Sequence, residues 1–323
     1  MESIEQLQQR LNLAFRDLVF PSDPVDLYDP IRYTLALGGK RIRPLLLLVA
    51  CQTFDGNLED AINPAIGIEL FHNFTLLHDD IMDQAPLRRG KETVYKKWNP
   101  NIAILSGDTM FALANKFMAG TRPGVIQEVM NLFNQTAIEV CEGQQYDMNF
   151  ESDSTVSISD YMEMIRLKTA VLLAASLKTG AVVAGAEVER CNAVYRFGIN
   201  LGLAFQLKDD LLDAYGSEAK FGKVTGGDIL AVKKTFLYLK TIELSQNKSV
   251  EFKNLYTGNL DNPAEKIQRV KHFFDQYNIA ELTNTEIGTY YQKALSDLNS
   301  LQLPAYKTEI LFKFAARLME RDS

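Results

Sequence analysis

The chain has 323 residues, 46% of them hydrophobic, and a formal net charge of -7. This length and composition suffice for a large core, and the acidic balance excludes non-specific nucleic-acid binding, which needs a strong positive field. The sequence predicts neither a signal peptide at its start nor a membrane span, since no apolar run is long enough for one. Three scattered cysteines match no zinc or disulfide spacing, so the sequence predicts a cytoplasmic protein.

Helical periodicity dominates most of the chain. In the segment 60–83, apolar residues recur at spacings of three and four, as they do from Ile66 to Leu77. Further helices are expected over 100–119, 124–148, 160–184, 189–214, 233–245, 261–277, 279–298 and 304–320. The helices between 60 and 214 are apolar around much of their circumference, as in the interior of a bundle. We therefore predict one all-α domain over residues 1–323.

Two local signals predict where helices begin. The segment "NPA" occurs at 63–65 and at 262–264, with asparagine as the N-cap and proline as the first helical residue. Asp160 and Glu163 have the spacing of a capping box at the start of the segment 160–184.

Two copies of one acidic pattern end apolar helical segments: "DDIMD" at 79–83 and "DDLLD" at 209–213. On a helix, the first and fifth residues of each copy project side by side. Like charges at this spacing destabilise a helix, and anions near its C-terminus oppose the helix dipole. Hard divalent cations would neutralise both motifs, because carboxylates suit Mg²⁺, which commonly bridges to phosphates. We interpret the two motifs as halves of one metal clamp across a cavity and not as solvated helix ends.

Three basic, glycine-containing loops interrupt the helices: "LGGKRIRP" at 37–44, "QAPLRRGKETVYKKWNP" at 84–100 and "GSEAKFGKVTGGD" at 216–228. The second and third follow the acidic motifs directly. Arginine binds phosphate with a planar fork and lysine as a movable point charge. A solvated turn is the alternative for any one loop, and the first is not a P-loop because GxxxxGK[ST] is missing. Together the loops and aspartates predict two diphosphate substrates, one held through Mg²⁺ and one by direct contacts.

Other catalytic chemistry has little support. We find neither a serine nucleophile elbow nor an HExxH zinc motif. His72 lies two helical turns before Asp80, so we expect it to face the same cavity and bind substrate. His78 directly precedes Asp79, and pairing with a carboxylate is the simpler role for it.

The chain resembles the trans-type isoprenyl diphosphate synthases, also called polyprenyl synthetases, over residues 30–240. The resemblance rests on the order and spacing of "GGKRIRP", "LLHDDIMD", "PLRRGKETV", "CEGQQYD", "RLKTA", "FQLKDDLLD", "FGKVTGGDI" and "VKKT". It implies an isoprenoid synthase-type bundle of long antiparallel helices around a central cavity, usually a homodimer. It also implies a prenyltransferase that joins isopentenyl diphosphate head-to-tail to dimethylallyl, geranyl or farnesyl diphosphate. The implied cofactor is Mg²⁺, as three ions when substrate is bound.

The resemblance also implies roles for individual residues. The aspartate-rich motifs of the family bind the Mg²⁺ that bridges the allylic diphosphate, and they are matched by Asp79, Asp80, Asp83, Asp209, Asp210 and Asp213. Positions that contact the same diphosphate are matched by Arg88, Lys168, Lys223 and Lys233. Positions that line the reacting centre are matched by Thr169 and Gln206. Positions of the isopentenyl diphosphate site are matched by Lys40, Arg43, His72 and Arg89. The loop "GKVTGGD" departs from the family pattern by one extra residue after Lys223.

The residues and the resemblance indicate one mechanism. The allylic carbon–oxygen bond ionises while Mg²⁺, lysine and arginine stabilise the leaving diphosphate. The isopentenyl double bond then attacks the allylic cation, and the departing diphosphate is the expected proton acceptor. Oxygen dipoles of Thr169 and Gln206 are expected to stabilise the cation, and an apolar cavity excludes water.

Bulky residues before the first acidic motif are candidates for the floor of the product cavity. Phe74 lies five residues before Asp79, about 7.5 Å along the helix axis, and Phe71 lies eight before it, about 12 Å along. Thr75, four before it, is small. An aromatic residue at the position of Phe74 resembles family members that make C15 or C20 products, whereas Phe71 also suits ordinary core packing. We therefore expect a C15–C20 prenyl diphosphate.

Several alternatives stay open at this point. A longer-chain polyprenyl diphosphate synthase or a non-catalytic partner subunit would share the same motifs. A class I terpene cyclase is disfavoured, because we expect an Asn/Ser/Glu-type second motif there instead of "DDLLD". A head-to-head synthase of the squalene type is disfavoured for similar reasons.

Overall fold

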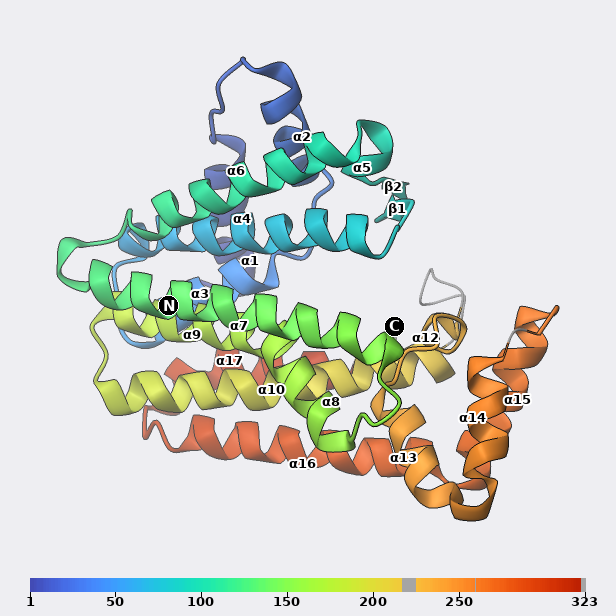
Figure 1. The fold of residues 1–323 in the computed structure, drawn as a ribbon. Helices are drawn as coiled ribbons and strands as arrows, with labels where there is room; N and C mark the ends of the chain where they lie inside the picture. Colours follow the sequence, from blue (N-terminus) through green and yellow to red (C-terminus); the bar gives the residue numbers. More distant parts are fainter. Residues whose placement is uncertain (217–224, 259, 321–323) are drawn as a thin grey trace. The chain divides into compact units, whose positions relative to one another are not determined.

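The computed structural model describes residues 1–216, 225–258 and 260–320 of the chain (Figure 1). Within these residues nearly all regular structure is helical, and the only paired strands are β1 (Leu87–Arg88) and β2 (Lys91–Glu92), which form an antiparallel hairpin. The predicted all-α class is therefore confirmed, with one short hairpin that the sequence did not predict.

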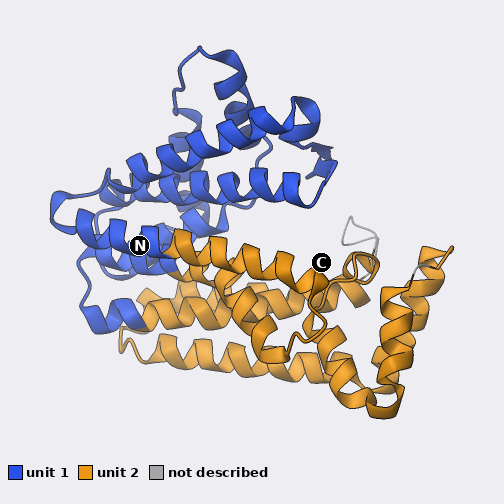
Figure 2. Ribbon diagram, viewed as in Figure 1, with its two compact units in different colours: residues 1–135, 175–192 blue, residues 136–174, 193–323 orange. Residues whose placement is uncertain are grey.

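The chain divides into two compact units (Figure 2). Unit 1 comprises Met1–Gln135 and Ala175–Asn192, and unit 2 comprises Thr136–Ala174 and Ala193–Ser323. The three division points, after residues 135, 174 and 192, all fall inside long helices, and each unit has buried apolar side chains of its own. A single domain over 1–323 stays a prediction.

Unit 1 is built around two buried helices. Its elements before residue 126 are α1 (Ile4–Arg16), α2 (Val25–Ala36), α3 (Ile42–Thr53), α4 (Leu58–Met82), the hairpin, α5 (Val94–Lys97), α6 (Pro100–Met118) and η1 (Pro123–Val125). Helix α4 packs along α6 and against α3, and α4 and α6 lie side by side in Figure 1. Every residue of α3 from Pro44 to Thr53 is buried. A helix buried all round shows no apolar stripe, which is why periodicity did not reveal α3.

Helix α4 does not begin at the segment "NPA", contrary to the prediction. It begins after Asn57, whose side chain accepts a backbone hydrogen bond from Glu59 in the first turn. Pro64 therefore lies inside the helix, where it has no N–H to donate to the carbonyl of Asp60. The hydroxyl of Thr121 donates to that carbonyl at 3.1 Å and satisfies it from a neighbouring loop.

Unit 2 contains the remaining helices, several of which the sequence predicted within a few residues. They are the later part of α7 (Ile126–Ser152), α8 (Ile158–Ile165), the π-helical turn η2 (Arg166–Ala170), the start of α9 (Val171–Ala184), most of α10 (Val188–Tyr215), α12 (Gly227–Leu230), α13 (Phe236–Ser245), η3 (Gln246–Lys248), α14 (Ser249–Thr257), α15 (Pro263–Gln276), α16 (Ile279–Asn299) and α17 (Ala305–Met319). The second "NPA" segment is confirmed, because Asn262 caps α15 and Pro263 is its first residue.

The capping box of α8 lies one turn earlier than predicted. The side chain of Ser157 accepts the backbone N–H of Asp160, and the carboxylate of Asp160 accepts the backbone N–H of Ser157. Asp160 is thus the third helical residue and not the cap. The predicted helix 160–184 is also interrupted, because η2 separates α8 from α9.

The segment Ile158–Ala184 is long and apolar enough, by length and composition, to cross a membrane. However, 78% of its most apolar window is buried inside the protein, which is typical of a core helix. Among the described residues it is the one such candidate, and it gives weak evidence for a membrane span.

Gly180 allows α9 to approach α3 within unit 1, and its replacement tests this packing. A Cβ atom at Gly180 would lie 2.1 Å from the carbonyl oxygen of Leu47. We expect Gly180→Ala to lower the free energy of unfolding by about 1–3 kcal/mol, measured by urea denaturation. Gly288 on α16 has nothing within 4 Å of such an atom, so Gly288→Ala should raise that free energy by about 0.5–1 kcal/mol. Equal stability of Gly180→Ala and wild type would contradict the close approach.

Candidate functional site

The second acidic motif lies near the C-terminal end of α10 and is held by a network of hydrogen bonds within unit 2. Asp210 is buried, and each of its carboxylate oxygens accepts a hydrogen bond. Tyr161 on α8 donates its hydroxyl to one oxygen, and the side-chain amide of Gln206 donates to the other at 3.0 Å. Asp213 accepts the backbone N–H of Asp228 at 2.9 Å and so caps the start of α12.

The pKa of Asp210 reports the charge around this motif. Burial first, and next the charge of Asp228, raises the pKa of Asp210 to about 8, while the hydrogen bonds from Tyr161 and Gln206 oppose the rise. Burial therefore favours the protonated carboxyl of Asp210, and a bound cation would be needed to favour its ionised form. Strongly perturbed carboxylates in a cavity are typical of functional sites.

The π-helical turn η2 supplies two further predicted residues, Lys168 and Thr169. Its approach to α7 depends on Gly143, because a Cβ atom there would lie 2.3 Å from the backbone nitrogen of Lys168. Lys168 points to Asp147 on α7, with 2.5 Å between ammonium and carboxylate. Thr169 donates its hydroxyl to the side-chain oxygen of Gln206 at 3.1 Å. Such π-helical turns occur frequently at functional sites.

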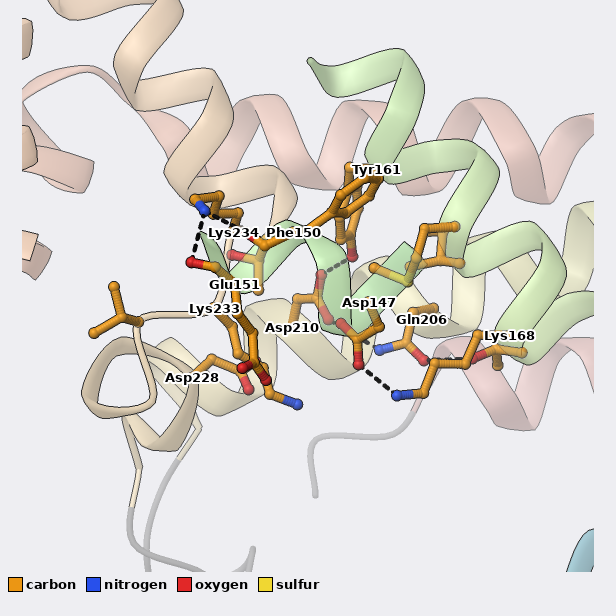
Figure 3. A pocket seen from close by; sticks show the side chains of 15 residues that line it. Asp147, Phe150, Glu151, Tyr161, Lys168, Gln206, Asp210, Asp228, Lys233 and Lys234 are labelled. Carbon is orange, nitrogen blue, oxygen red and sulfur yellow. Dashed lines mark hydrogen bonds and ion pairs between the residues drawn. The ribbon is translucent and has the colours of Figure 1, made fainter. Parts of the chain in front are cut away.

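These side chains surround one cavity of about 130 Å³ in unit 2 (Figure 3). Of the predicted site residues it is lined by Lys168, Thr169, Gln206, Asp210 and Lys233. Its lining also includes Asp147, Tyr161, Asp228 and Lys234. Figure 3 shows Lys168 reaching Asp147 and Tyr161 reaching Asp210. The structure thus brings together two predicted residues, Thr169 of η2 and Gln206 of α10, which are 37 positions apart in the sequence.

Three acidic or hydroxyl-bearing residues of this cavity were missed by the sequence analysis. Asp147 ends the motif "CEGQQYD" and Asp228 ends "GGD", so both stood within recognised motifs without an assigned role. Tyr161 stands in no motif, and the sequence carries no signal for its contact with Asp210. Lys223, by contrast, was predicted to bind diphosphate but lies outside the described residues.

The first acidic motif closes α4 in unit 1 and is partly neutralised within the protein. Asp79 and Asp80 lie in the last turn of α4, and Asp83 is its C-cap. Asp80 is buried and forms a two-pronged ion pair with Arg88 of β1, with the shortest distance 2.7 Å. Burial raises the pKa of Asp80, and Arg88 opposes this effect.

A second group of basic side chains lies beside the loop 37–44 in unit 1. Arg89 and Gly90 form the turn of the hairpin with positive φ angles of 54° and 74°. The Arg89 guanidinium packs over Gly39, since a Cβ atom at that glycine would lie 2.8 Å from it. One terminal nitrogen of Arg43 lies 3.3 Å from Nε2 of His72, and within the described part of the chain its buried Nε has no hydrogen-bond partner. Lys40 is exposed.

The charge of this group is balanced by one buried acid. Burial raises the pKa of Glu69 on α4, whereas the charges of Arg43, Arg41 and Arg89 lower it. Burial first, and next the charge of Arg43, holds the pKa of His72 well below its usual range. His72 is therefore neutral near pH 7, and its ring N–H can donate a hydrogen bond to an anion. Several guanidinium groups against one carboxylate leave an excess of positive charge that suits a phosphate ligand.

His78 does not join either group. Its Nε2 lies 3.2 Å from the carbonyl oxygen of Ile104 and 3.9 Å from the carboxylate of Asp108 on α6. Gly107 makes room for it, because a Cβ atom there would lie 2.4 Å from the same Nε2. The expected pairing with a carboxylate is thus weak, and α6 supplies it instead of the acidic motif.

The predicted floor residues belong to a cluster of phenylalanines in unit 1. Phe74 stacks on Phe111 of α6 with 5.2 Å between ring centroids, and Phe71 lies 5.6 Å from Phe74. Phe71 is fully buried and meets Phe133 edge-on at 5.3 Å. Thr75 donates its hydroxyl back to the carbonyl of His72 and adds no bulk. Phe71 is therefore a packing partner that fixes the ring of Phe74.

The carboxylates of the two acidic motifs suit Mg²⁺ better than a metal that is coordinated by protein side chains alone. Among the residues that the structure describes, no three Asp, Glu, His or Cys side chains are arranged to hold a metal alone. Mg²⁺ is usually held by one or two carboxylates together with water and substrate phosphates. The raised pKa of Asp210 and the acids near it are consistent with that donor set.

Comparison with known proteins gives consistent matches. The family model described as polyprenyl synthetase matches residues 24–276. The geranylgeranyl pyrophosphate synthase of Geoglobus acetivorans is 35% identical over 324 residues and covers 99% of each chain. A crystal structure of a geranylgeranyl pyrophosphate synthase matches 100% of both chains at 44% identity, with a TM-score of 0.95. A polyprenyl synthase from Caulobacter crescentus CB15, crystallised with calcium and isoprenyl diphosphate, has a TM-score of 0.87 at 29% identity and covers 99% of this chain and 98% of its own.

The raised pKa of Asp210 predicts how pH affects metal-free protein. The folded carboxyl has a pKa of about 8, whereas an unfolded one titrates near about 3.9. Between these two pKa values, the folded state therefore binds a proton that the unfolded state does not bind. The free energy of unfolding falls as the pH rises through this range, because binding that proton becomes less favourable. We expect wild type to lose up to about 1.4 kcal/mol per pH unit relative to Asp210→Asn, which cannot titrate. Urea denaturation with a chelator from pH 5 to 8 measures this, and parallel pH profiles would contradict it.

Proposed function

This chain belongs to the polyprenyl synthetase family and is a prenyltransferase, and on that premise we propose that it condenses isopentenyl diphosphate head-to-tail with an allylic diphosphate to give a C15–C20 prenyl diphosphate. The observation that carries the proposal is the network around the cavity of unit 2. There, Lys168, Thr169, Gln206 and Asp210 line one space, as a site for an allylic diphosphate requires. A geranylgeranyl product is favoured, because the relatives reported above bear that name.

We propose that each acidic motif binds Mg²⁺ and that basic side chains near it bind the allylic diphosphate. Lys168 and Lys233 line the cavity with Asp210, so they supply positive charge where the leaving group would lie. Arg88 is engaged with Asp80 in this structure. A diphosphate would bind Arg88, and a cation would bind Asp80. We therefore expect the ion pair between Arg88 and Asp80 to break when these ligands bind. Three Mg²⁺ ions would be held by Asp79, Asp80, Asp83, Asp209, Asp210 and Asp213, and would supply positive charge to neutralise the diphosphate.

The isopentenyl diphosphate site is proposed at the basic group of unit 1. Arg43 and Arg89 offer guanidinium forks there, and Lys40 on the exposed loop adds a movable charge. The buried Nε of Arg43 has no partner among the described residues, so a phosphate oxygen would satisfy it. Neutral His72 beside Arg43 can donate or accept a hydrogen bond at the same place.

The reacting carbon atoms are proposed to lie near Thr169 and Gln206. The hydroxyl of Thr169 donates to Gln206, so the lone pairs of its oxygen stay available to an allylic cation. Gln206 in turn donates to Asp210, which fixes the orientation of its amide. Preorganised dipoles of this kind stabilise developing charge without reorganising. The released diphosphate is the expected acceptor of the final proton.

Three finer proposals concern the setting of the enzyme. We expect a homodimer, because Ile104 and Leu105 on α6 are 42% and 59% exposed, and sedimentation velocity tests this. We expect a cytoplasmic location, because the spacing of the three cysteines predicts no disulfide framework. The accepted primer is expected to be dimethylallyl, geranyl or farnesyl diphosphate.

Product analysis tests the reaction and both acidic motifs. Purified protein with isopentenyl diphosphate, each allylic primer and Mg²⁺ should yield C15–C20 products by chromatography. Asp80→Ala and Asp209→Ala should each lower turnover by about 10²-fold or more, because charge on the leaving group is no longer neutralised. Asp29→Ala, which removes a surface partner of Arg32, is the matched control and should keep wild-type turnover. Turnover near wild type in both motif variants would remove the metal assignment.

The same assay separates the alternative functions. Products much longer than C20 would identify a longer-chain polyprenyl diphosphate synthase. No product with any primer, despite intact helical structure, would favour a non-catalytic partner subunit.

Truncation of Phe74 tests the length of the product. Phe74→Ala removes a ring that Phe111 and Phe71 hold in place, so the cavity floor should open and products should lengthen by at least one C5 unit. Phe273→Ala in unit 2 is a control that removes a ring of equal size from a different core. It should destabilise the protein without changing the product spectrum. An unchanged product spectrum in Phe74→Ala would show that Phe74 is not the floor.

A further inference from the structure

The N-terminal helix α1 precedes the segment that the family model matches, which begins at residue 24. It is nevertheless tightly packed within unit 1. Leu7 and Leu11 are fully buried, and Phe15 is 8% exposed. Helix α1 contacts α3 and α4, the helices that carry the basic loop and the first acidic motif. Its packing therefore places it next to elements of the proposed isopentenyl diphosphate site.

Arg41 connects the loop 37–44 to this helix. The guanidinium carbon of Arg41 lies 4.2 Å from the centroid of the Phe15 ring, at the distance of a cation–π contact. Its Nη1 atom donates to the side-chain oxygen of Asn12 at 2.9 Å. Asn12 and Phe15 are three residues apart and lie on the same side of α1. One side chain of the loop is thus held by two side chains of one helical face.

Arg41 and Arg43 reach different helices although only one residue separates them. Arg43 contacts His72 on α4, whereas Arg41 contacts α1. Arg41 also borders a surface hollow of about 310 Å³ with Asn12 and Phe15, and neither Arg43 nor Lys40 lines it. The side-chain contacts of Arg41 are therefore with α1, while Arg43 contacts His72 in the proposed substrate site.

The backbone at Arg41 needs such an anchor. Arg41 caps the N-terminus of α3 in a left-handed conformation with φ of 46°, which is unfavourable for a residue with a Cβ atom. Arg41 directly follows Lys40 and lies two residues before Arg43, so its conformation sets the direction of both. The loop also supports Arg89, whose guanidinium packs over Gly39. Contacts that hold Arg41 thus bear on every basic residue proposed for the site.

We propose that α1 acts as a positioning element for the isopentenyl diphosphate site, and that Arg41 is the positioning residue through which it acts. This inference rests on the function proposed above for Lys40, Arg43 and Arg89. Arg41 does not contact substrate in this arrangement. It holds the loop in the conformation that the other basic residues require, by binding Phe15 and Asn12.

The test measures binding of isopentenyl diphosphate itself, by isothermal titration calorimetry without an allylic primer. Phe15→Leu and Arg41→Gln should each weaken the Kd by about 5- to 10-fold, because a partly buried cation–π contact has roughly that value. The double variant should be no weaker than Arg41→Gln alone, since both changes break one link. In turnover assays the KM for isopentenyl diphosphate should rise in parallel. The kcat and the KM for the allylic primer should stay within about twofold.

Two control variants separate positioning from general destabilisation. Arg16→Gln changes an exposed charge of α1 that pairs with Asp17, and Leu7→Val weakens the packing of α1 without touching Arg41. Both should keep the wild-type Kd, even if Leu7→Val lowers the melting temperature. Arg41→Lys keeps the cation over Phe15 and should recover part of the affinity.

The other outcomes separate failure of this proposal from failure of the proposed reaction. If Arg41→Gln weakens binding while Phe15→Leu does not, Arg41 contacts substrate directly. If Leu7→Val weakens binding as much as Phe15→Leu, the effect is structural only. Wild-type protein that does not bind isopentenyl diphosphate would overturn both this inference and the site assignment. Protein that binds it and responds to Phe15→Leu, but forms no product, would overturn the proposed reaction and leave the positioning role intact.

Discussion

Burial of acidic side chains against apolar helices is the constraint on which the rest of the site depends. Asp80 and Asp210 are almost fully buried, and an unpaired buried carboxylate is costly. The protein meets this cost in two ways. Asp80 forms an ion pair with Arg88, whereas Asp210 accepts hydrogen bonds from Tyr161 and Gln206, which carry no charge. The charge of Asp80 is thus offset within the chain, while Asp210, whose pKa is raised to about 8, favours its protonated form in the absence of a cation. The two acidic motifs share a pattern but differ in electrostatic state.

Close backbone contacts place the groups that surround this acid. Gly143 lets α7 approach the π-helical turn, and that turn presents Lys168 and Thr169 on consecutive residues. Without a Cβ atom at position 143, the two backbones can approach to a distance that any other residue would block. The network from Thr169 through Gln206 to Asp210 then orients a neutral dipole next to a charged group. Packing geometry therefore determines the chemistry of the cavity as directly as the motif residues do.

The sequence predicted most of the long helices within a few residues, but it predicted none of the three helices that precede α4. The range 100–119 corresponds to α6 (Pro100–Met118), because a clear apolar stripe and an Asn-Pro start define it. Helix α3 was missed because its residues are buried all round and show no stripe. The start of α4 was misplaced because Pro64 resembles a first helical residue. Thr121, far along the chain, makes an internal proline tolerable there by donating to the carbonyl that Pro64 leaves free.

By itself the sequence determined the all-α class, the order of the motifs and the types of residue available for binding diphosphate and Mg²⁺. These depend on local periodicity and on short patterns, which a chain shows without folding. Only the tertiary structure decided which charges are offset and by what. Tyr161 and Asp210 are 49 positions apart, and Arg41 and Asn12 are 29 positions apart. Such pairs form because helix packing brings distant side chains within hydrogen-bonding distance, and no local pattern encodes that distance.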